Sequence, residues 1–284
     1  MKIKEFRFYF VKQLTPLYGI DEATSFFYII LYNIHQLKRT DLALQPDLEM
    51  SKLHYKMWNA IISELKTYKP IQYILGETHF FGLRLKVDEN TLIPRPETEE
   101  LVQLILDNPL VHTTKITKIL DIGTGSGCIA IALAKNCLTA TVFALDVSEK
   151  ALDVAKSNAT SNQVVVSFAQ MDILKTAQLG DTFDVIVSNP PYVRQLEKTE
   201  IHKNVLHFEP HLALFVDDDD PLLFYKKIAH LAQNHLSENG FLYFEINQYL
   251  GKETVDMLKN LNFKNVTLYQ DVYGNDRMIA CTLN

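Results

Sequence analysis

The stretch Val185–Tyr192 has the residue types that most clearly predict chemistry, with the sequence Val-Ile-Val-Ser-Asn-Pro-Pro-Tyr. Its β-branched first half predicts a strand that is covered on both faces. The prolines must end that strand, since neither can donate a ladder hydrogen bond, and Pro191 also holds Pro190 extended. We therefore expect Asn189 at a strand tip, on a backbone with little freedom.

This motif is suited to alkylation of a planar amide or amino nitrogen, whose lone pair is delocalised and poorly nucleophilic. The Asn189 side-chain oxygen and the Pro190 carbonyl are two acceptors for the hydrogens on such a nitrogen. Tyr192 is a flat wall on which the planar group can stack. No strong base is needed, because the nitrogen loses its proton easily once it carries the new carbon. The alternative is a proline-capped loop with no chemistry.

The composition predicts a soluble protein of one large or two modest domains. The chain has 284 residues, of which 47% are apolar. It contains neither an apolar run of ~20 residues nor a signal-peptide core at its start, so we expect a cytoplasmic protein without a membrane partner. Three cysteines without CxxC spacing, Cys128, Cys137 and Cys281, predict reduced packing residues and no metal site.

The charge is unevenly distributed. The whole chain carries −6, whereas residues 1–70 hold ten Lys and Arg against seven acidic residues. The overall charge argues against a nucleic acid held through its phosphates. Any basic contact surface lies on the N-terminal part and is too weak to identify a partner.

Residues 1–69 are predicted to form a small helical bundle that recognises the substrate. A helix over 2–14 is broken by Pro16 and Gly19, and Asp21 is predicted to cap a second helix. A third, amphipathic helix is indicated by apolar residues every four positions, namely Leu53, Met57, Ile61 and Leu65, beside Trp58 and Ile62. Residues 70–92 are predicted to be a linker, with a hairpin over Phe80–Val87.

Residues 93–284 alternate between strands and helices. The predicted strands are 119–122, 141–145, 164–168, 185–187, 241–246, 266–269 and 278–281. The predicted helices are 97–108, 128–136, 148–159, 221–236 (capped by Asp220) and 252–261. This alternation predicts an α/β fold, an open and mostly parallel seven-stranded sheet with helices on both faces.

A second group of residues falls at the carboxyl ends of these strands and predicts a nucleoside site. The turn after the first strand combines glycines with small polar residues: Asp121, Gly123, Thr124, Gly125, Ser126 and Gly127. Asp146 ends the second strand, where a carboxylate binds ribose hydroxyls. Asp172 follows the third strand and can accept an adenine amine, with Ile173 against the ring. Asn189 lies on the same edge, where open α/β sheets bind ligands.

The nucleoside ligand is a dinucleotide or S-adenosylmethionine. Dinucleotide sites use G-x-G-x-x-G, whereas the spacing here is Gly123-x-Gly125-x-Gly127. No partner site for hydride chemistry is evident. An electrophilic methyl group beside Asn189 fits better.

These residues together resemble the class I S-adenosylmethionine-dependent methyltransferases, which have a Rossmann-like fold. Within that class the chain is similar to the protein-(glutamine-N5) methyltransferases of peptide-chain release factors, called PrmC or HemK. The similarity extends from about Pro70 to Arg277. It rests on Pro70–Gly76, Leu92–Glu99, Asp121–Gly127, Val187–Tyr192, Glu209-Pro210 with Ala213-Leu214, and Gly274–Arg277. The N-terminal bundle matches the family in size and class.

The resemblance implies that a release factor is the partner and that the glutamine of its Gly-Gly-Gln motif becomes N5-methylglutamine. S-adenosylhomocysteine would be the other product, no metal would be involved, and the protein would act as a monomer. Thr98 would close over the methionine part of the cofactor. The substrate would contact Arg95, Glu97, Asn189, Pro190, Pro191 and Tyr192, with Asn189 also bordering the cofactor.

Two departures from the family pattern are expected to lie away from the chemistry. An acidic run, Asp217–Asp220, replaces a glycine-containing loop and is predicted to be solvated. Asn247 stands where the family tends to have glycine.

Three other functions remain open. The same motif serves ribosomal-protein glutamine methyltransferases. It also serves adenine-N6 methyltransferases, which flip the target base. A non-catalytic translation-factor binding module is the third possibility, against which the intact Asn189–Tyr192 motif argues.

Overall fold

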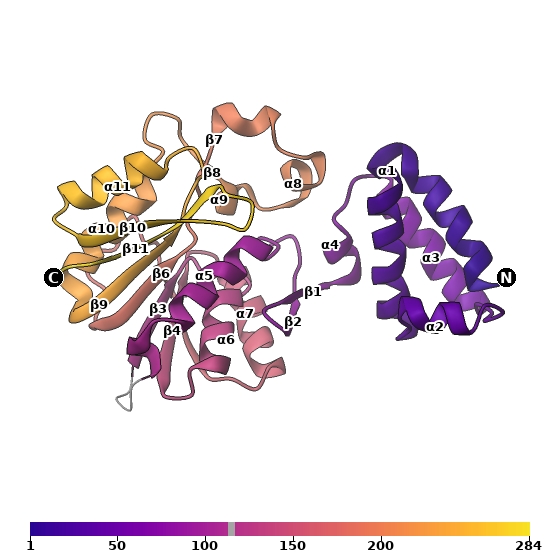
Figure 1. The fold of residues 1–284 in the computed structure, drawn as a ribbon, viewed down its shortest axis with the longest axis horizontal. Helices are drawn as coiled ribbons and strands as arrows, with labels where there is room; N and C mark the ends of the chain where they lie inside the picture. The colour runs from indigo at the N-terminus through magenta and orange to yellow at the C-terminus, as the bar shows by residue number, and fades with distance from the viewer. Residues whose placement is uncertain (113–116) are drawn as a thin grey trace. The chain divides into compact units, whose positions relative to one another are not determined.

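The computed structural model describes residues 1–112 and 117–284. The chain divides into two compact units (Figure 1). The first contains Met1–Gly76 and His202–Phe208, and the second contains Glu77–Ile201 and Glu209–Asn284. A hairpin is present, but it spans Glu77–Lys86, whereas Phe80–Val87 was predicted; it belongs to the second unit. A linking role for residues 70–92 stays a prediction.

The first unit is entirely helical, apart from an isolated bridge between Lys2 and Glu49. Its helices are α1 (Ile3–His35), α2 (Arg39–Leu44), α3 (Lys52–Leu65), α4 (Ile71–Leu75) and α8 (Lys203–Phe208). The predicted break is a kink within α1 at Gly19, whose φ of 77° and ψ of 169° are not helical. Pro16 is accommodated inside the helix. Gly19 alone therefore interrupts the helix, whereas Pro16 and Gly19 together were predicted to break it.

Trp58 is the centre of this unit's core and is fully buried. The rings of Phe6 and Phe10 meet it edge-on, at centroid distances of 5.5 and 5.4 Å. The predicted amphipathic helix is confirmed as α3, although two residues of its apolar stripe, Leu53 and Met57, are 66% and 42% exposed. The buried positions of α3 follow a helical repeat instead and are Trp58, Ile61, Ile62 and Leu65.

The second unit is built on a seven-stranded sheet in the order β10-β11-β9-β6-β3-β4-β5. Two smaller sheets pair β1 with β2 and β7 with β8. The strands of the whole unit are β1 (Glu77–Phe80), β2 (Leu83–Lys86), β3 (Thr117–Ile122), β4 (Ala140–Asp146), β5 (Val166–Gln170), β6 (Phe183–Ser188), β7 (Val193–Arg194), β8 (Phe215–Val216), β9 (Leu236–Glu245), β10 (Lys264–Gln270) and β11 (Asp276–Thr282). Its helices are α5 (Pro96–Leu106), η1 (Pro109–His112), α6 (Cys128–Asn136), α7 (Glu149–Ser161), η2 (Gln195–Thr199), α9 (His211–Leu214), α10 (Leu223–His235) and α11 (Gly251–Asn260).

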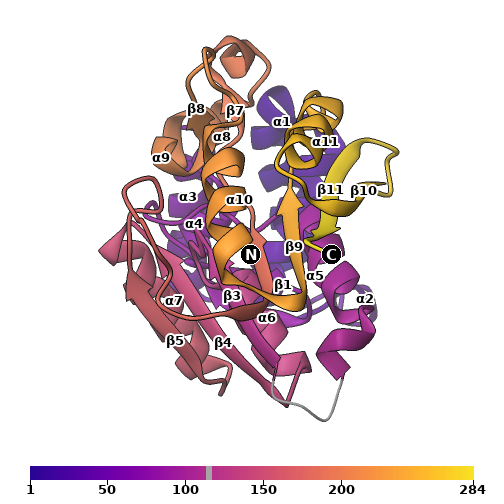
Figure 2. The same ribbon diagram turned by 90° about the vertical axis from the view of Figure 1, so that its left-hand side faces the viewer.

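The predicted mostly parallel sheet is confirmed. Neighbours among β5, β4, β3, β6 and β9 run parallel, and β11 is antiparallel to both β9 and β10. Strands β5, β4 and β3 are neighbours in this order and can be followed in Figure 2. Helices α5, α6 and α7 cover one face, and α10 and α11 cover the other (Figure 1).

The strand order reverses at β3, which has β4 on one side and β6 on the other. Chain segments leaving β3 and its neighbours diverge at that point, so their carboxyl ends frame a crevice. The turn after β3, the end of β4 and the motif after β6 all open onto it.

Helix α10 begins at Leu223, two residues later than the start predicted at Pro221. Asp220 does not cap it. The Asp220 carboxylate instead accepts a hydrogen bond from the Lys226 ammonium at 2.7 Å. The Asp220 carboxylate, predicted to cap the helix, is thus paired with Lys226 in the first turn of α10.

Candidate active site

A cavity of about 360 Å³ lies at the carboxyl edge of the parallel strands. This volume falls within the range of small-molecule sites, ~300–1,000 Å³. Five residues predicted to bind a cofactor line it: Gly123, Gly125, Asp146, Asp172 and Ile173. Three residues of the substrate motif line it too: Asn189, Pro190 and Pro191. Members of both predicted groups therefore share one cavity, whereas Tyr192, the last residue of the motif, is not among the residues that line it.

The turn after β3 brings backbone close to this cavity. Gly123, Gly125 and Gly127 have φ values of 77°, 55° and 83°, a region that favours glycine. A Cβ atom on Gly127 would also lie 2.8 Å from Ile131 and 3.1 Å from Ala155. Glycine is thus required at Gly127 both by the backbone and by the contact of α6 with α7.

Asp121 and Ser126 support this turn from inside. Asp121 is fully buried, and its Oδ2 accepts hydrogen bonds from the Thr124 hydroxyl (2.6 Å) and the Ala130 amide (3.2 Å). Burial raises the pKa of Asp121 to about 7. Among the described residues, Asp121 Oδ1 and Ser126 Oγ are buried without a hydrogen-bond partner. Both atoms keep hydrogen-bonding capacity that a polar ligand at the turn could use.

Asp146 ends β4 beside the turn and is held by it. Its Oδ2 accepts from the Gly125 amide at 2.8 Å, and its Oδ1 accepts from the Ser148 amide at 2.9 Å. A carboxylate has about four acceptor sites, so each oxygen keeps a second lone pair for a ligand hydroxyl. Burial raises the pKa of Asp146, while hydrogen bonds from the backbone amides of Ser148, Gly125 and Val147 oppose that shift.

Asp172 occupies a more open position after β5. Its Oδ1 accepts from the Leu174 amide at 3.1 Å, and its Oδ2 lies 2.9 Å from the Lys175 ammonium. The lysine lowers the pKa of Asp172. Ile173 follows it in the cavity wall as an apolar surface.

The Asn189 amide is oriented by two residues from other elements. Its Nδ2 donates to the Thr98 hydroxyl of α5 at 3.3 Å, and that hydroxyl donates to Glu245 Oε2 of β9 at 2.6 Å. Among the described residues, the Asn189 side-chain oxygen has no hydrogen-bond donor, so it is available to a ligand. This oxygen is the acceptor that the motif was predicted to provide.

Thr98 is buried and is not among the residues that line the cavity. Its contact with the methionine part of a cofactor stays a prediction. Asp121, Thr124, Ser126 and Gly127 likewise lie behind the cavity lining. They support the turn, and a contact with a cofactor stays a prediction for each of them.

Tyr192 is fixed at both ends. Its hydroxyl donates to Glu245 Oε1 at 3.1 Å, and its carbonyl accepts from Asn247 Nδ2 at 2.9 Å. Burial, followed by the Glu245 charge, raises the pKa of Tyr192, so the phenol stays protonated. Asn247 was expected to lie away from the chemistry. That was wrong, because its side chain holds the last residue of the motif.

Arg95 is held at the start of α5. Its guanidinium lies 2.5 Å from Glu209 Oε1, and Glu209 Oε2 accepts from the Ile93 amide at 3.1 Å. The Glu209 side chain is 1% exposed. This pair ties the loop before α5 to the segment after residue 208. Arg95 and Glu97 are not among the residues that line the cavity, and contact with a substrate stays a prediction for both.

Glu245 and Glu209 were not predicted as functional residues. The sequence signal that could have identified Glu245 is its position as a single carboxylate at the end of a predicted buried strand. Its register is also informative, since Phe244 pairs with Ser188, which places Glu245 level with Asn189. Glu209 belonged to a recognised segment, but nothing in the sequence linked it to Arg95.

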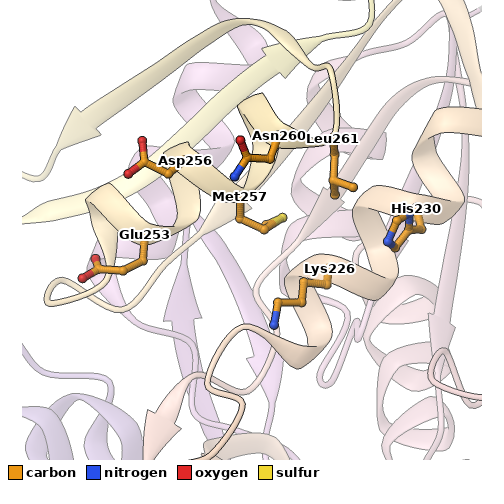
Figure 3. Close-up of a pocket in the computed structure, with 7 residues that line it drawn as sticks. All are labelled: Lys226, His230, Glu253, Asp256, Met257, Asn260 and Leu261. Carbon is orange, nitrogen blue, oxygen red and sulfur yellow. The ribbon is translucent and has the colours of Figure 1, made fainter.

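A second, more open pocket of about 480 Å³ lies between α10 and α11 (Figure 3). Its lining includes Lys226, His230, Glu253 and Met257, and none of the predicted site residues. No function is assigned to it. Within residues 1–112 and 117–284, no group of three or more His, Cys, Asp or Glu residues could hold a metal ion. No helix of that same part is both long and apolar enough to cross a membrane.

Comparison with known proteins identifies relatives of both units. Residues 98–211 match the methyltransferase small domain, and residues 9–76 match the PrmC N-terminal domain. A release factor glutamine methyltransferase of Flavobacterium psychrophilum is 61% identical over 280 residues, covering 98% of each chain. Its namesake from Bacteroides thetaiotaomicron is 41% identical over 274 residues, covering 96% of this chain and 97% of the relative.

A solved structure confirms the class I methyltransferase fold. The hMettl16 catalytic domain, in complex with MAT2A 3′UTR hairpin 6, superposes with a TM-score of 0.60. It covers 77% of this chain and 84% of its own, at 17% sequence identity. At that identity the similarity concerns the fold alone.

Proposed function

The chain belongs to the family of release factor glutamine methyltransferases, and we propose that it methylates the side-chain amide nitrogen of the glutamine in the Gly-Gly-Gln motif of a release factor. The methyl donor is S-adenosylmethionine. The C–S bond of the donor breaks as the C–N bond forms, and the amide nitrogen gives up one proton to solvent. The products are N5-methylglutamine and S-adenosylhomocysteine.

One observation supports this proposal most directly. No donor in the described part of the chain reaches the Asn189 side-chain oxygen, and Asn189 lines a cavity that Gly123, Gly125 and Asp146 also line. An acceptor for an amide hydrogen is therefore next to a nucleoside-sized space. This arrangement suits transfer between a bound nucleoside and a planar nitrogen.

The residues present fit the cofactor. Asp146 keeps a free lone pair on each oxygen for the ribose hydroxyls, and Asp172 with Ile173 suits an adenine. Gly123 and Gly125 allow close approach, and the orphaned Asp121 Oδ1 and Ser126 Oγ offer polar atoms behind the turn. When bound, S-adenosylmethionine supplies an electrophilic methyl group on a sulfonium.

The substrate amide is positioned by the motif. Asn189 Oδ1 and the Pro190 carbonyl accept the two N–H hydrogens, which directs the nitrogen lone pair away from both oxygens. Tyr192 forms a wall against the planar group. Because these acceptors are fixed before the substrate arrives, no reorganisation is needed at the moment of transfer.

Three further residues are proposed to contact the substrate. Pro191 lines the cavity beside Pro190 and narrows the space open to the amide. Arg95, braced by Glu209, and Glu97 at the start of α5 are proposed to contact the substrate loop. These contacts select a glutamine that is presented on an exposed loop.

The first unit is proposed to recognise the body of the release factor. A glutamine side chain offers little binding energy, and selecting one on a folded protein needs a second contact. Leu53 and Met57 lie one helical turn apart on α3, and both are exposed. Apolar side chains exposed at i and i+4 form a ridge that a protein partner can cover.

Transfer of labelled methyl tests the proposal. The protein is incubated with labelled S-adenosylmethionine and a release factor, a release factor whose motif glutamine is replaced by asparagine, ribosomal proteins, or nucleic acid. Label should enter only the unaltered release factor. Label in ribosomal protein or nucleic acid alone would favour the other methyltransferase functions, and no label anywhere would favour a binding module.

A further inference from the structure

Glu245 is a buried carboxylate that the proposed chemistry does not use. It ends β9 and is 1% exposed. Burial raises its pKa, opposed by hydrogen bonds from Thr98 and Tyr192 and by the Arg277 charge. Burying a carboxylate costs free energy unless partners compensate for it. An apolar residue would pack here at lower cost, so the contacts of Glu245 need an explanation.

One carboxylate oxygen determines which way the Asn189 amide faces. The Thr98 hydroxyl has a single hydrogen, which it gives to Glu245 Oε2 at 2.6 Å. Toward Asn189 that hydroxyl can act only as an acceptor. The group facing it at 3.3 Å must therefore be the Asn189 NH₂, and the amide oxygen must face the other way. A flipped amide would present donors to the substrate NH₂ and bind it poorly.

The other carboxylate oxygen fixes the ring of Tyr192. Glu245 Oε1 accepts from the Tyr192 hydroxyl at 3.1 Å. The phenol keeps its proton, so it serves as a donor to the carboxylate. The two side chains that are proposed to contact the substrate amide, Asn189 and Tyr192, are thus both connected to a single carboxylate.

We propose that Glu245 is a positioning residue, which sets the direction of the Asn189 amide through Thr98 and holds the Tyr192 ring directly. This inference rests on the proposed function, because it assigns a role in that methyl transfer. Glu245 itself touches neither substrate nor cofactor. Its effect should appear in kcat and much less in cofactor affinity.

A set of variants in the full chain separates this role from a structural one. Thr98→Val keeps the volume and removes the hydroxyl, and should lower kcat about tenfold. Thr98→Ser restores the hydroxyl and should recover most of the loss. In the Asn189→Ala background, Thr98→Val should change kcat less than twofold, because the amide it orients is gone. Equal effects in both backgrounds would overturn the role of Thr98 as an orienting group.

The second arm tests Glu245 itself. Glu245→Gln should lower kcat about tenfold in the wild type and less than twofold in Thr98→Val/Tyr192→Phe, where both of its routes are cut. The same loss in both backgrounds would mean that Glu245 acts otherwise, and the proposal would fall. If the wild type transfers no methyl to a release factor, the proposed function fails instead. An active wild type with a fully active Glu245→Gln variant overturns only the positioning role.

Discussion

Asn247 Nδ2 donates a hydrogen bond to the Tyr192 carbonyl at 2.9 Å, and it donates another to Glu197 Oε2 at 3.0 Å. Asn247 is 5% exposed. Glycine, which the family resemblance led us to expect at this position, lacks the side chain needed for either bond. In this chain the end of the motif is therefore tied to η2 and to the end of β9 by one amide.

Asn247→Ala is expected to destabilise the protein by about 1–3 kcal/mol, because it leaves the buried partners of that amide unsatisfied. The free energy of unfolding in urea measures this. Asn234→Ala is the matched control, since the side chain of Asn234 makes a local, exposed bond to the His230 carbonyl. Equal stability of the two variants would show that the Asn247 amide contributes nothing to the fold.

Asp121 makes stability depend on pH. Its pKa is about 7 in the folded protein against an ordinary value of 3.8, so the folded state holds a proton that the unfolded state has released. Its contribution is complete below pH ~4 and is lost as the pH rises through about 7. Asp121→Asn keeps a neutral group throughout. Relative to the wild type, this variant should gain about 2–3 kcal/mol between pH 5 and 8.5.

Urea unfolding of both proteins at the two pH values measures this gain. Asp153→Asn, at a position where the side chain is 70% exposed, should keep a constant difference from the wild type. If the Asp121→Asn difference is equally constant, Asp121 is ionised throughout.

Asp146→Ala is expected to weaken binding of S-adenosylmethionine at least tenfold. Charge-assisted bonds to ribose hydroxyls contribute about 1.5–3 kcal/mol each, and the change also frees the Gly125 amide from its acceptor. Calorimetric titration of the full chain measures the affinity. Asp153→Ala on α7 is the control and should bind as the wild type does. Unchanged affinity in Asp146→Ala would remove this carboxylate from the cofactor site.

If the exposed pair Leu53 and Met57 on α3 recognises the release factor, replacing both should weaken activity on the intact protein and not on a short peptide. Leu53→Ser with Met57→Ser should raise KM for intact release factor several-fold and leave activity on a short Gly-Gly-Gln peptide unchanged. Both side chains are exposed, so stability should change by less than about 0.5 kcal/mol per site. Leu138→Ser, at a side chain that is 92% exposed before β4, serves as the control. An equal KM for both variants would exclude this ridge from recognition.

The sequence predicts the cavity well because strand ends are local features. Asp146 and Asn189 each follow a recognisable apolar strand, and parallel strands bring their carboxyl ends to one edge. Glu245 could not be assigned a role in this way, since its partner Thr98 is 147 residues away. Asn247 was misjudged for the same reason, because its bonds depend on the packing of η2.

Helical periodicity gave a different kind of error. Leu53 and Met57 fit a stripe with Ile61 and Leu65, yet the buried face of α3 is rotated toward Trp58. Spacing shows that apolar residues share a face, but a tertiary contact decides which face is covered. The distinction matters here because the exposed pair forms the proposed ridge.

Asn189→Ala tests the central claim most directly. The wild type and the variant are each incubated with S-adenosylmethionine and a release factor, and the peptide with the Gly-Gly-Gln motif is followed by mass spectrometry. The wild type should add one methyl group to the glutamine, and the variant should do so ~10²–10³-fold more slowly, as when a preorganised polar group is lost. Cofactor affinity should stay nearly the same in both. Methylation of that glutamine by the variant at the wild-type rate would contradict the account.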